Sequence, residues 1–220
     1  MAAREGTGSR RVEVAAGRVP GWLERFGERH GGVVVTGGPD EVVATGADGA
    51  VARLQVPFPP LVVDEAAPDA GLAAHVLRAR RVGVLLVRLG GHAVGVFEGD
   101  RLVTSKVGSR QVHGRSAAGG WSQQRFARRR EGQVRVALAA AADLAATLLV
   151  PVAPELDALV VGGDRRSVDA VLADPRLAPL RGLVVAPLLD VPDPRRAVLD
   201  SAPDRFLSVP VRVIDTPALS

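Results

Sequence analysis

The sequence predicts an α/β protein, with a mixed β-sheet and flanking helices that follow a small β-rich N-terminal part. Short apolar runs separated by Gly-rich turns fill the first 60 residues, and a three-strand meander then leads into a long Ala-rich helix. In the last third, buried-type strands alternate with helices, which is typical of parallel pairing in an α/β layer. The 220 residues, 47% of them apolar, are enough for one large or two small domains.

Residues 1–60 are expected to form a small N-terminal α+β part. Trp22, Leu23 and Phe26 recur at helical spacing and predict a helix over Pro20–His30. Short apolar runs between Gly-rich turns predict strands on either side of it. These strands are expected at Arg11–Val14, Val33–Thr36, Glu41–Thr45 and Val51–Val56.

Residues 70–220 are expected to form the second and larger domain. It starts with a helix from about Asp69 to Arg80, and three strands joined by tight Gly-containing turns then form a meander. A long helix follows, from Ser122 or Arg125 through an Ala-rich stretch to Leu149. The strands of the meander are expected at Val82–Leu89, Ala93–Glu98 and Arg101–Lys106.

The last third of the chain alternates strands with helices. This order predicts that its strands pair in parallel within one α/β layer. The strands are expected at Leu156–Val161, Gly182–Ala186 and Val209–Ile214, and the helices at Arg165–Ala173 and Pro194–Ser201.

The basic charge of the chain is concentrated in residues 101–135. This window holds nine basic residues and one acid, Glu131, whereas the whole chain has a net charge of only +4. The stretch Gly119-Gly120-Trp121-Ser122-Gln123-Gln124 lies inside it and predicts a mobile polar tip. A Gly/Gln tip ringed by arginines is typical of a segment that enters a polyanion, and RNA is the first candidate.

Four arginines at the start of the long helix strengthen the RNA hypothesis. A solvated helix face is the alternative. Arginine at a helix N-terminus opposes the macrodipole, however, and no acid four residues away compensates it. We therefore favour contact with phosphates, which would be directed mostly at the backbone and sensitive to salt. The four residues are Arg125, Arg128, Arg129 and Arg130.

The composition argues against several other classes of protein. There is no cysteine, which excludes disulfides, thiolate metal sites and a cysteine nucleophile, and the four histidines lack metal-ligand spacing. The N-terminus has no apolar h-region, and the longest apolar run, Val134–Val152, is broken by charges and a proline. We expect no signal peptide, membrane span or metal site, and a cytoplasmic protein.

Some glycines and carboxylates carry a weaker signal for a ligand. Gly31–Gly38 lacks the Lys-Ser/Thr of a P-loop, so it predicts a strand between two Gly turns. Gly162-Gly163 precedes a helix whose N-terminus could bind an anion, but the charge of Asp164 would repel phosphate and favours an N-cap. Aspartates near strand ends could form an acid pair or a magnesium site, although caps and turns are the preferred interpretation. They are Asp157, Asp164, Asp169, Asp190 and Asp193.

Four short motifs within about 25 residues together resemble a known family. They are Gly108-Ser109-Arg110, Gly114-Arg115-Ser116, Gly119–Arg125 and Arg128–Arg130. These motifs are similar to those of the Vms-like release factors, specifically the actinobacterial branch of peptidyl-tRNA hydrolases. That group is related to the middle domain of the archaeal and eukaryotic class-I release factor. The element order from about residue 70 onward is compatible with the ribonuclease H-like topology of that domain.

The resemblance implies a catalytic loop at residues 107–124 that enters the peptidyl transferase centre of the large ribosomal subunit. Gly120-Trp121-Ser122-Gln123 fits the family pattern G-x-x-Q, so Gln123 inherits the role of orienting water against the peptidyl-tRNA ester. Gln124 follows directly and Gln111 ends a second G-x-x-Q, so three glutamines are candidates. Gly119 and Gly120 supply the flexible backbone of the tip. The arginines that would hold phosphates are Arg110, Arg115, Arg125, Arg128, Arg129 and Arg130.

The function implied by the resemblance is hydrolysis of peptidyl-tRNA on stalled or split large subunits, a ribosome-rescue role. The implied partners are the large ribosomal subunit with its rRNA and peptidyl-tRNA, and no cofactor or metal is required. A noncatalytic rRNA- or tRNA-binding module, in which the Gly/Gln tip only anchors, is an alternative from another class. A nucleotide-binding α/β protein that uses Gly162-Gly163 is a third.

Overall fold

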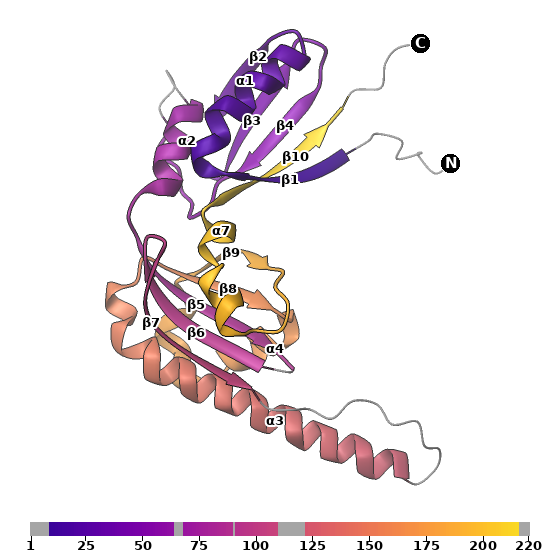
Figure 1. The fold of residues 1–220 in the computed structure, drawn as a ribbon, viewed down its shortest axis with the longest axis vertical. Coiled ribbons are helices and arrows are strands. Elements are labelled where there is room, and N and C mark those ends of the chain that lie inside the picture. Colours follow the sequence, from indigo (N-terminus) through magenta and orange to yellow (C-terminus); the bar gives the residue numbers. More distant parts are fainter. Residues whose placement is uncertain (1–8, 64–67, 90, 110–121, 216–220) are drawn as a thin grey trace. The chain divides into compact units, whose positions relative to one another are not determined.

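The computed structural model describes residues 9–63, 68–89, 91–109 and 122–215, and for residues 68–70, 109 and 122–130 it describes the backbone. The chain forms two compact units, each considered by itself (Figure 1). One unit combines Met1–Arg78 with Pro203–Ser220, and the other is Ala79–Ala202.

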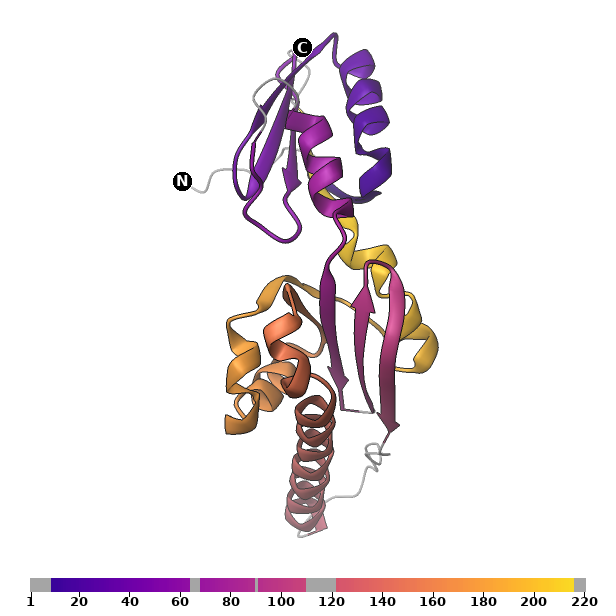
Figure 2. The same cartoon turned by 90° about the vertical axis from the view of Figure 1, so that its left-hand side faces the viewer.

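A five-stranded antiparallel sheet forms the first unit. Its strand order is β1-β10-β4-β3-β2, so the last strand of the chain lies between the first strand and β4. Helices α1 (Val19–Arg29) and α2 (Pro68–Leu77) pack on one face of this sheet, with the short helices η1 (Ala16–Arg18) and α7 (Pro203–Phe206) at its end (Figure 2). The strands are β1 (Ser9–Ala15), β2 (Val33–Gly37), β3 (Glu41–Gly46), β4 (Val51–Gln55) and β10 (Ser208–Ile214).

Alternation along the strands builds the core of this unit. Val42 and Ala44 in β3, and Ala52 and Leu54 in β4, are fully buried, whereas their neighbours in the sequence point to the opposite face. Leu23 of α1 belongs to the same apolar cluster. The sheet is therefore covered by helices on one face and exposed on the other.

The second unit contains a mixed sheet with the strand order β7-β6-β5-β8-β9. The pairs β5–β6 and β6–β7 are antiparallel, while β5–β8 and β8–β9 are parallel. The first three strands are therefore the meander, and the last two extend the sheet in parallel on the other side of β5. The strands are β5 (Arg81–Arg88), β6 (Gly91–Glu98), β7 (Arg101–Ser109), β8 (Ala158–Gly163) and β9 (Val184–Leu189).

Helices cover both faces of this mixed sheet. Helices α3 (Ser122–Leu148) and α4 (Arg165–Leu172) pack on one face, in a cluster that includes Leu85 of β5. On the other face, Leu199 of α6 (Arg196–Asp200) lies over Gly95 of β6. Figure 2 shows the strands between these two layers. The remaining short helices are η2 (Val150–Glu155), η3 (Pro175–Leu177) and α5 (Ala178–Arg181).

The expected fold class is confirmed: a mixed sheet with flanking helices accompanies a small β-rich part. The division of the chain differs from the boundaries expected at residues 60 and 70. Helix α2 packs in the first unit, and β10 pairs antiparallel with β1 and β4 instead of joining the parallel layer. The alternating pattern of β10, with Val209, Val211 and Val213 buried, fits a sheet that is covered on one face.

Candidate functional site

The predicted catalytic tip lies at the connection between β7 and α3. Strand β7 ends at Ser109 and α3 begins at Ser122. The expected loop 107–124 is therefore shorter at both ends, because its first residues extend β7 and its last residues begin α3. Of the predicted site residues, Gly119, Gly120, Arg110 and Arg115 lie outside the described residues, as does the alternative glutamine Gln111.

Helix α3 supplies the other predicted site residues from its first turns. Gln123 and Gln124 are its second and third residues, and the described backbone there is helical. The first turn contains no acidic residue. The N-terminal positive end of the helix dipole and the sequence's arginines therefore act in the same direction, which favours an anionic partner. These arginines are Arg125, Arg128, Arg129 and Arg130.

The C-terminal half of α3 anchors the helix to the sheet. Ala141, Ala142 and Ala145 are buried, and their small side chains place the helix axis close to the strands. Alanine also has the highest helix propensity, so one stretch provides both the helix and its close packing. The N-terminal half continues beyond the strands in Figure 1, and its described residues Arg135 and Val136 are exposed.

The described ends of the basic segment keep part of its positive charge. Arg101 at the start of β7 forms an ion pair with Glu98. Lys106 on the same edge strand and Arg135 on α3 are exposed, and no ion pair of either with another described residue is recorded. Two exposed cations thus lie on the elements that flank the tip, and of these Arg135 has Glu131 one turn before it on α3.

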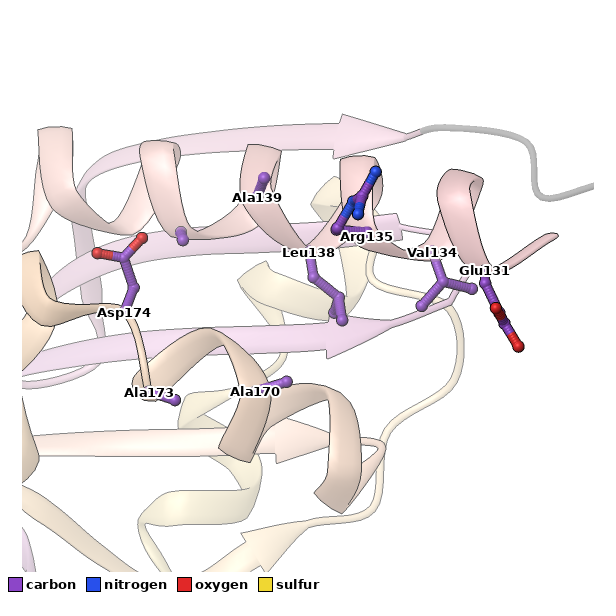
Figure 3. Close-up of a pocket in the computed structure, with 9 residues that line it drawn as sticks. Glu131, Val134, Arg135, Leu138, Ala139, Ala170, Ala173 and Asp174 are labelled. Carbon is purple, nitrogen blue, oxygen red and sulfur yellow. The ribbon is translucent and has the colours of Figure 1, made fainter. Parts of the chain in front are cut away.

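An apolar groove of about 630 Å³ lies between α3 and α4. Figure 3 shows Leu138 pointing from α3 toward Ala170 of α4, with Glu131 and Arg135 at the end nearer the start of α3. This groove was not predicted from the sequence, because Val134 and Leu138 have the spacing of ordinary core residues. Val134 and Leu138 are only half-buried because of the way α3 packs beside α4, and this packing cannot be predicted from local sequence.

An arginine fork binds Asp174, which lines the opposite end of the groove. The Arg176 guanidinium donates to Asp143 of α3 at 2.8 Å and to Asp174 at 2.7 Å and 3.0 Å. The Arg176 side chain and backbone N–H, both donating to the Asp174 carboxylate, lower its pKa to about 2. This fork ties α3 to the segment that follows α4, at the end of the helix away from the predicted tip.

The Gly162-Gly163-Asp164 turn is accounted for by packing and capping. Gly163 has a φ of 103°, and a Cβ there would collide with the carbonyl oxygen of Val87. Asp164 accepts hydrogen bonds from the Ser167 hydroxyl at 2.6 Å and the Ser167 N–H at 3.0 Å. The bond from the hydroxyl, followed by that from the N–H, holds the pKa of Asp164 below its usual range. The carboxylate thus occupies the helix N-terminus that a nucleotide phosphate would need.

The other aspartates near strand ends have structural or solvent-exposed positions. Asp157 accepts a hydrogen bond from the backbone N–H of Arg81 at 2.7 Å and so fixes the start of β5. Asp169, Asp190 and Asp193 are exposed. In the described part of the chain, no group of three or more potential metal ligands comes together. No helix in that part has both the length and the apolar content needed to cross a bilayer.

Together, the mixed sheet and the basic helix start that follows its edge strand define an α/β domain with a candidate interface for nucleic acid. The chain belongs to the Actinobacteria/chloroflexi VLRF1 release factor family, whose family model matches residues 80–212. The match covers the mixed sheet, the connection between β7 and α3, and the start of β10.

Two solved structures are similar to the chain over most of its length. One is the archaeal translation termination factor aRF1, at 16% identity and a TM-score of 0.44, covering 90% of this chain and 64% of that one. The other is described as an archaeal protein, at 19% identity and a TM-score of 0.42, covering 72% of this chain and 48% of that one. The chain therefore spans less than two thirds of either structure. No curated protein matches it.

Proposed function

We propose that the protein hydrolyses the ester of peptidyl-tRNA on stalled or split large ribosomal subunits, and so rescues them. The observation that carries this proposal is the match to a release-factor family over residues 80–212, which include the whole Gly119–Gln124 stretch. In this proposal the tip enters the peptidyl transferase centre and Gln123 orients the attacking water. The partners are the large subunit, its rRNA and peptidyl-tRNA.

The proposed chemistry needs no metal or organic cofactor. The ester is already positioned for attack at the ribosomal site, so the protein has only to admit and orient a water molecule there. A glutamine amide is too weak a base to ionise water, but its oxygen can hold the water. A backbone N–H can stabilise the developing oxyanion. Gly119 and Gly120 let the backbone approach RNA closely.

The charge around the tip supports docking on ribosomal RNA. Arginine forks match phosphate oxygens, and the four arginines at the start of α3 follow directly after the proposed catalytic residue. Lys106 on β7 and Arg135 on α3 add positive charge on both flanking elements. Anchoring of α3 through Ala141 and Ala145 gives the tip a rigid base.

The same charge supports a second candidate function, a noncatalytic module that binds rRNA or tRNA. Backbone-directed contacts need only basic residues, whatever the role of the glutamines. The two functions differ in what Gln123 does. It acts on the reaction in the first and contributes at most to binding in the second.

Single-turnover release of peptide from stalled large subunits tests the proposed function. A group that orients water acts in the transition state, so Gln123→Ala should lower the release rate without weakening binding to the subunit. We expect a loss of about a hundredfold or more, the usual cost of removing one positioning group. Gln124→Ala should cost less and Gln111→Ala least, since Gln111 lacks the paired glycines.

Co-sedimentation with the large subunit provides the matched control. All three variants should sediment with it as the parent does. If Gln124→Ala or Gln111→Ala is the inactive variant, the assignment to Gln123 is wrong. If none of the three variants is impaired, no glutamine is catalytic. If the parent itself releases no more peptide than a protein-free control, the noncatalytic function stands in its place.

A further inference from the structure

Three arginines lie in one row across the exposed face of the first unit's sheet. The strand register places Arg11 of β1 opposite Arg212 of β10, and Arg212 opposite Arg53 of β4. All three are exposed and alternate with core positions such as Val211 and Leu54. They therefore face away from α1 and α2, although the sequence separates the first from the last by two hundred residues.

This row opposes folding of the sheet. Side chains directly opposite each other on adjacent strands have Cβ atoms roughly 5 Å apart, and like charges there are destabilising. The strands themselves need no arginine at these exposed positions, where threonine or valine has a higher β propensity. Packing within the sheet does not account for these three arginines, whereas binding of an anionic ligand would.

Two acids, Glu41 and Glu13, share this face with the arginines. Glu41 accepts a hydrogen bond from Arg53 at 2.6 Å. Burial raises the pKa of Glu13, and the charge of Arg205 on α7 lowers it in part. Among the described residues, no acidic partner of Arg11 or Arg212 is recorded, so these neighbouring cations face solvent together.

This face lacks the aromatic anchors of a typical protein–protein interface. The five strands contain no aromatic residue, whereas protein interfaces rely on aromatic anchors in a desolvated core. Beside the apolar Val34, Val43, Val51 and Ile214, this face carries polar side chains that include Thr36, Thr45 and Gln55. Such residues can donate to phosphate or sugar oxygens but offer no platform for stacked bases.

We propose that the exposed face of this sheet is a second RNA-binding surface, on which Arg11 and Arg212 hold phosphates of an RNA backbone. Arg53 is the third member of the row and remains tied to Glu41. The surface recognises backbone charge and not base sequence. It is separate from the Gly/Gln tip, so it does not depend on the release chemistry.

Binding of the full-length protein to a labelled 20-nucleotide single-stranded RNA tests this surface by fluorescence anisotropy across a salt series. The test variant is Arg11→Gln/Arg212→Gln. The matched control is Arg25→Gln/Arg29→Gln, which removes the same charge from exposed positions on α1, the helix on the opposite face. Each lost contact with single-stranded RNA lowers the slope of log K against log salt by about 0.7, so the sheet variant should lose about 1.4. That change corresponds to roughly twenty-five-fold in affinity at 0.1 M salt relative to 1 M.

The helix control should lose less than about twofold, because charges away from the contact act only through a screened field. The melting temperature of the sheet variant should equal or exceed that of the parent, since like-charge repulsion is relieved. Arg11→Lys/Arg212→Lys should keep the parental salt slope. Equal losses in both glutamine variants, unchanged RNA binding, or a lower melting temperature of the sheet variant would each overturn the proposal. Gln123→Ala should bind this RNA like the parent, so failure of peptide release and failure of this surface are distinguishable.

Discussion

The two sheets of the molecule bury their strands to different extents. In the second unit, β5 is buried at its six central positions and β6 at all but its last. In the first unit, β3 and β4 alternate between buried and more exposed positions. The difference follows from the layers, because helices cover both faces of the mixed sheet and only one face of the antiparallel sheet.

This difference determines where each unit can meet a partner. A sheet covered on both faces has only its edges, loops and helix ends available, and the predicted tip lies at such a place, between edge strand β7 and α3. A sheet covered on one face keeps the other available, and the row that contains Arg11 and Arg212 lies there. The two proposed RNA contacts thus use the surface that each architecture leaves exposed.

Adjacent leucines in β5 give the sharpest test of the two-sided core. Leu85 and Leu86 point to opposite faces and both are fully buried. Each Leu→Ala change should therefore lower the free energy of unfolding by about 2–5 kcal/mol, measured by urea denaturation. In the first unit only one of two neighbours should matter: Leu54→Ala should cost a similar amount, and Gln55→Ala less than about 0.5 kcal/mol. A small effect at either Leu85 or Leu86 would mean that one face of the mixed sheet is not closely packed.

Alanine substitutions at two glycines of the second unit distinguish the cost of backbone strain from the cost of a steric clash. Gly163→Ala should lower stability by about 2–3 kcal/mol, because the φ of 103° disfavours a side chain and the new Cβ meets the Val87 carbonyl. Gly99→Ala is the matched control, since its φ is 62° but no atom lies within 4 Å of the new Cβ. It should cost only about 1 kcal/mol in thermal unfolding. Peptide release at a permissive temperature should persist in both variants, and its selective loss in Gly163→Ala would assign the turn a direct role in function.

Local patterns in the sequence predicted the strands and the longer α-helices of this fold, but not its 3₁₀ helices or the short helices α5 and α7. Helical spacing at Trp22, Leu23 and Phe26 located α1, and the apolar runs located the strands to within a few residues. The alternation of strand and helix in the last third correctly predicted the parallel pair β8–β9, but not the parallel pairing of β8 with β5 of the meander. Local patterns could not predict the unit to which β10 belongs. Its partners β1 and β4 are distant in the sequence, and the sequence of a strand does not show which other strand it pairs with.

The candidate sites were predictable to different degrees. The N-cap role of Asp164 followed from its position between glycines and a helix, and its bonds to Ser167 confirm it. The assignment of Gln123 rests on motif and family and stays a prediction. The row of Arg11, Arg53 and Arg212 was missed, because each arginine is an ordinary exposed strand residue until the register brings the three together.

The smallest effect that we predict concerns the pH dependence of the Arg176 fork. The folded-state pKa of Asp174 is lowered to about 2 by the Arg176 hydrogen bonds, against about 4 for an unpaired aspartate. Because the pKa is depressed, the carboxylate stabilises the fold above pH 4, and this contribution is lost as the pH falls from about 4 to 2. Both partners are partly exposed to solvent, so the effect should be modest and should weaken with salt.

Thermal unfolding of Arg176→Ala and of the parent between pH 2 and pH 7 measures this contribution. Asp48 of the first unit serves as the internal control. The variant should be less stable than the parent at pH 7, and the two melting temperatures should approach each other as the pH falls to 2, where Asp174 becomes protonated in the folded state as well. Asp48 of the first unit also has a lowered pKa, mainly because of its 2.8 Å hydrogen bond with His30. Hydrogen exchange around Asp48 should therefore keep its acid sensitivity in the variant, while exchange in α3 near Asp143 should lose it. A constant gap in melting temperature across the whole pH range would show that Arg176 stabilises the second unit through packing and not through its charge on Asp174.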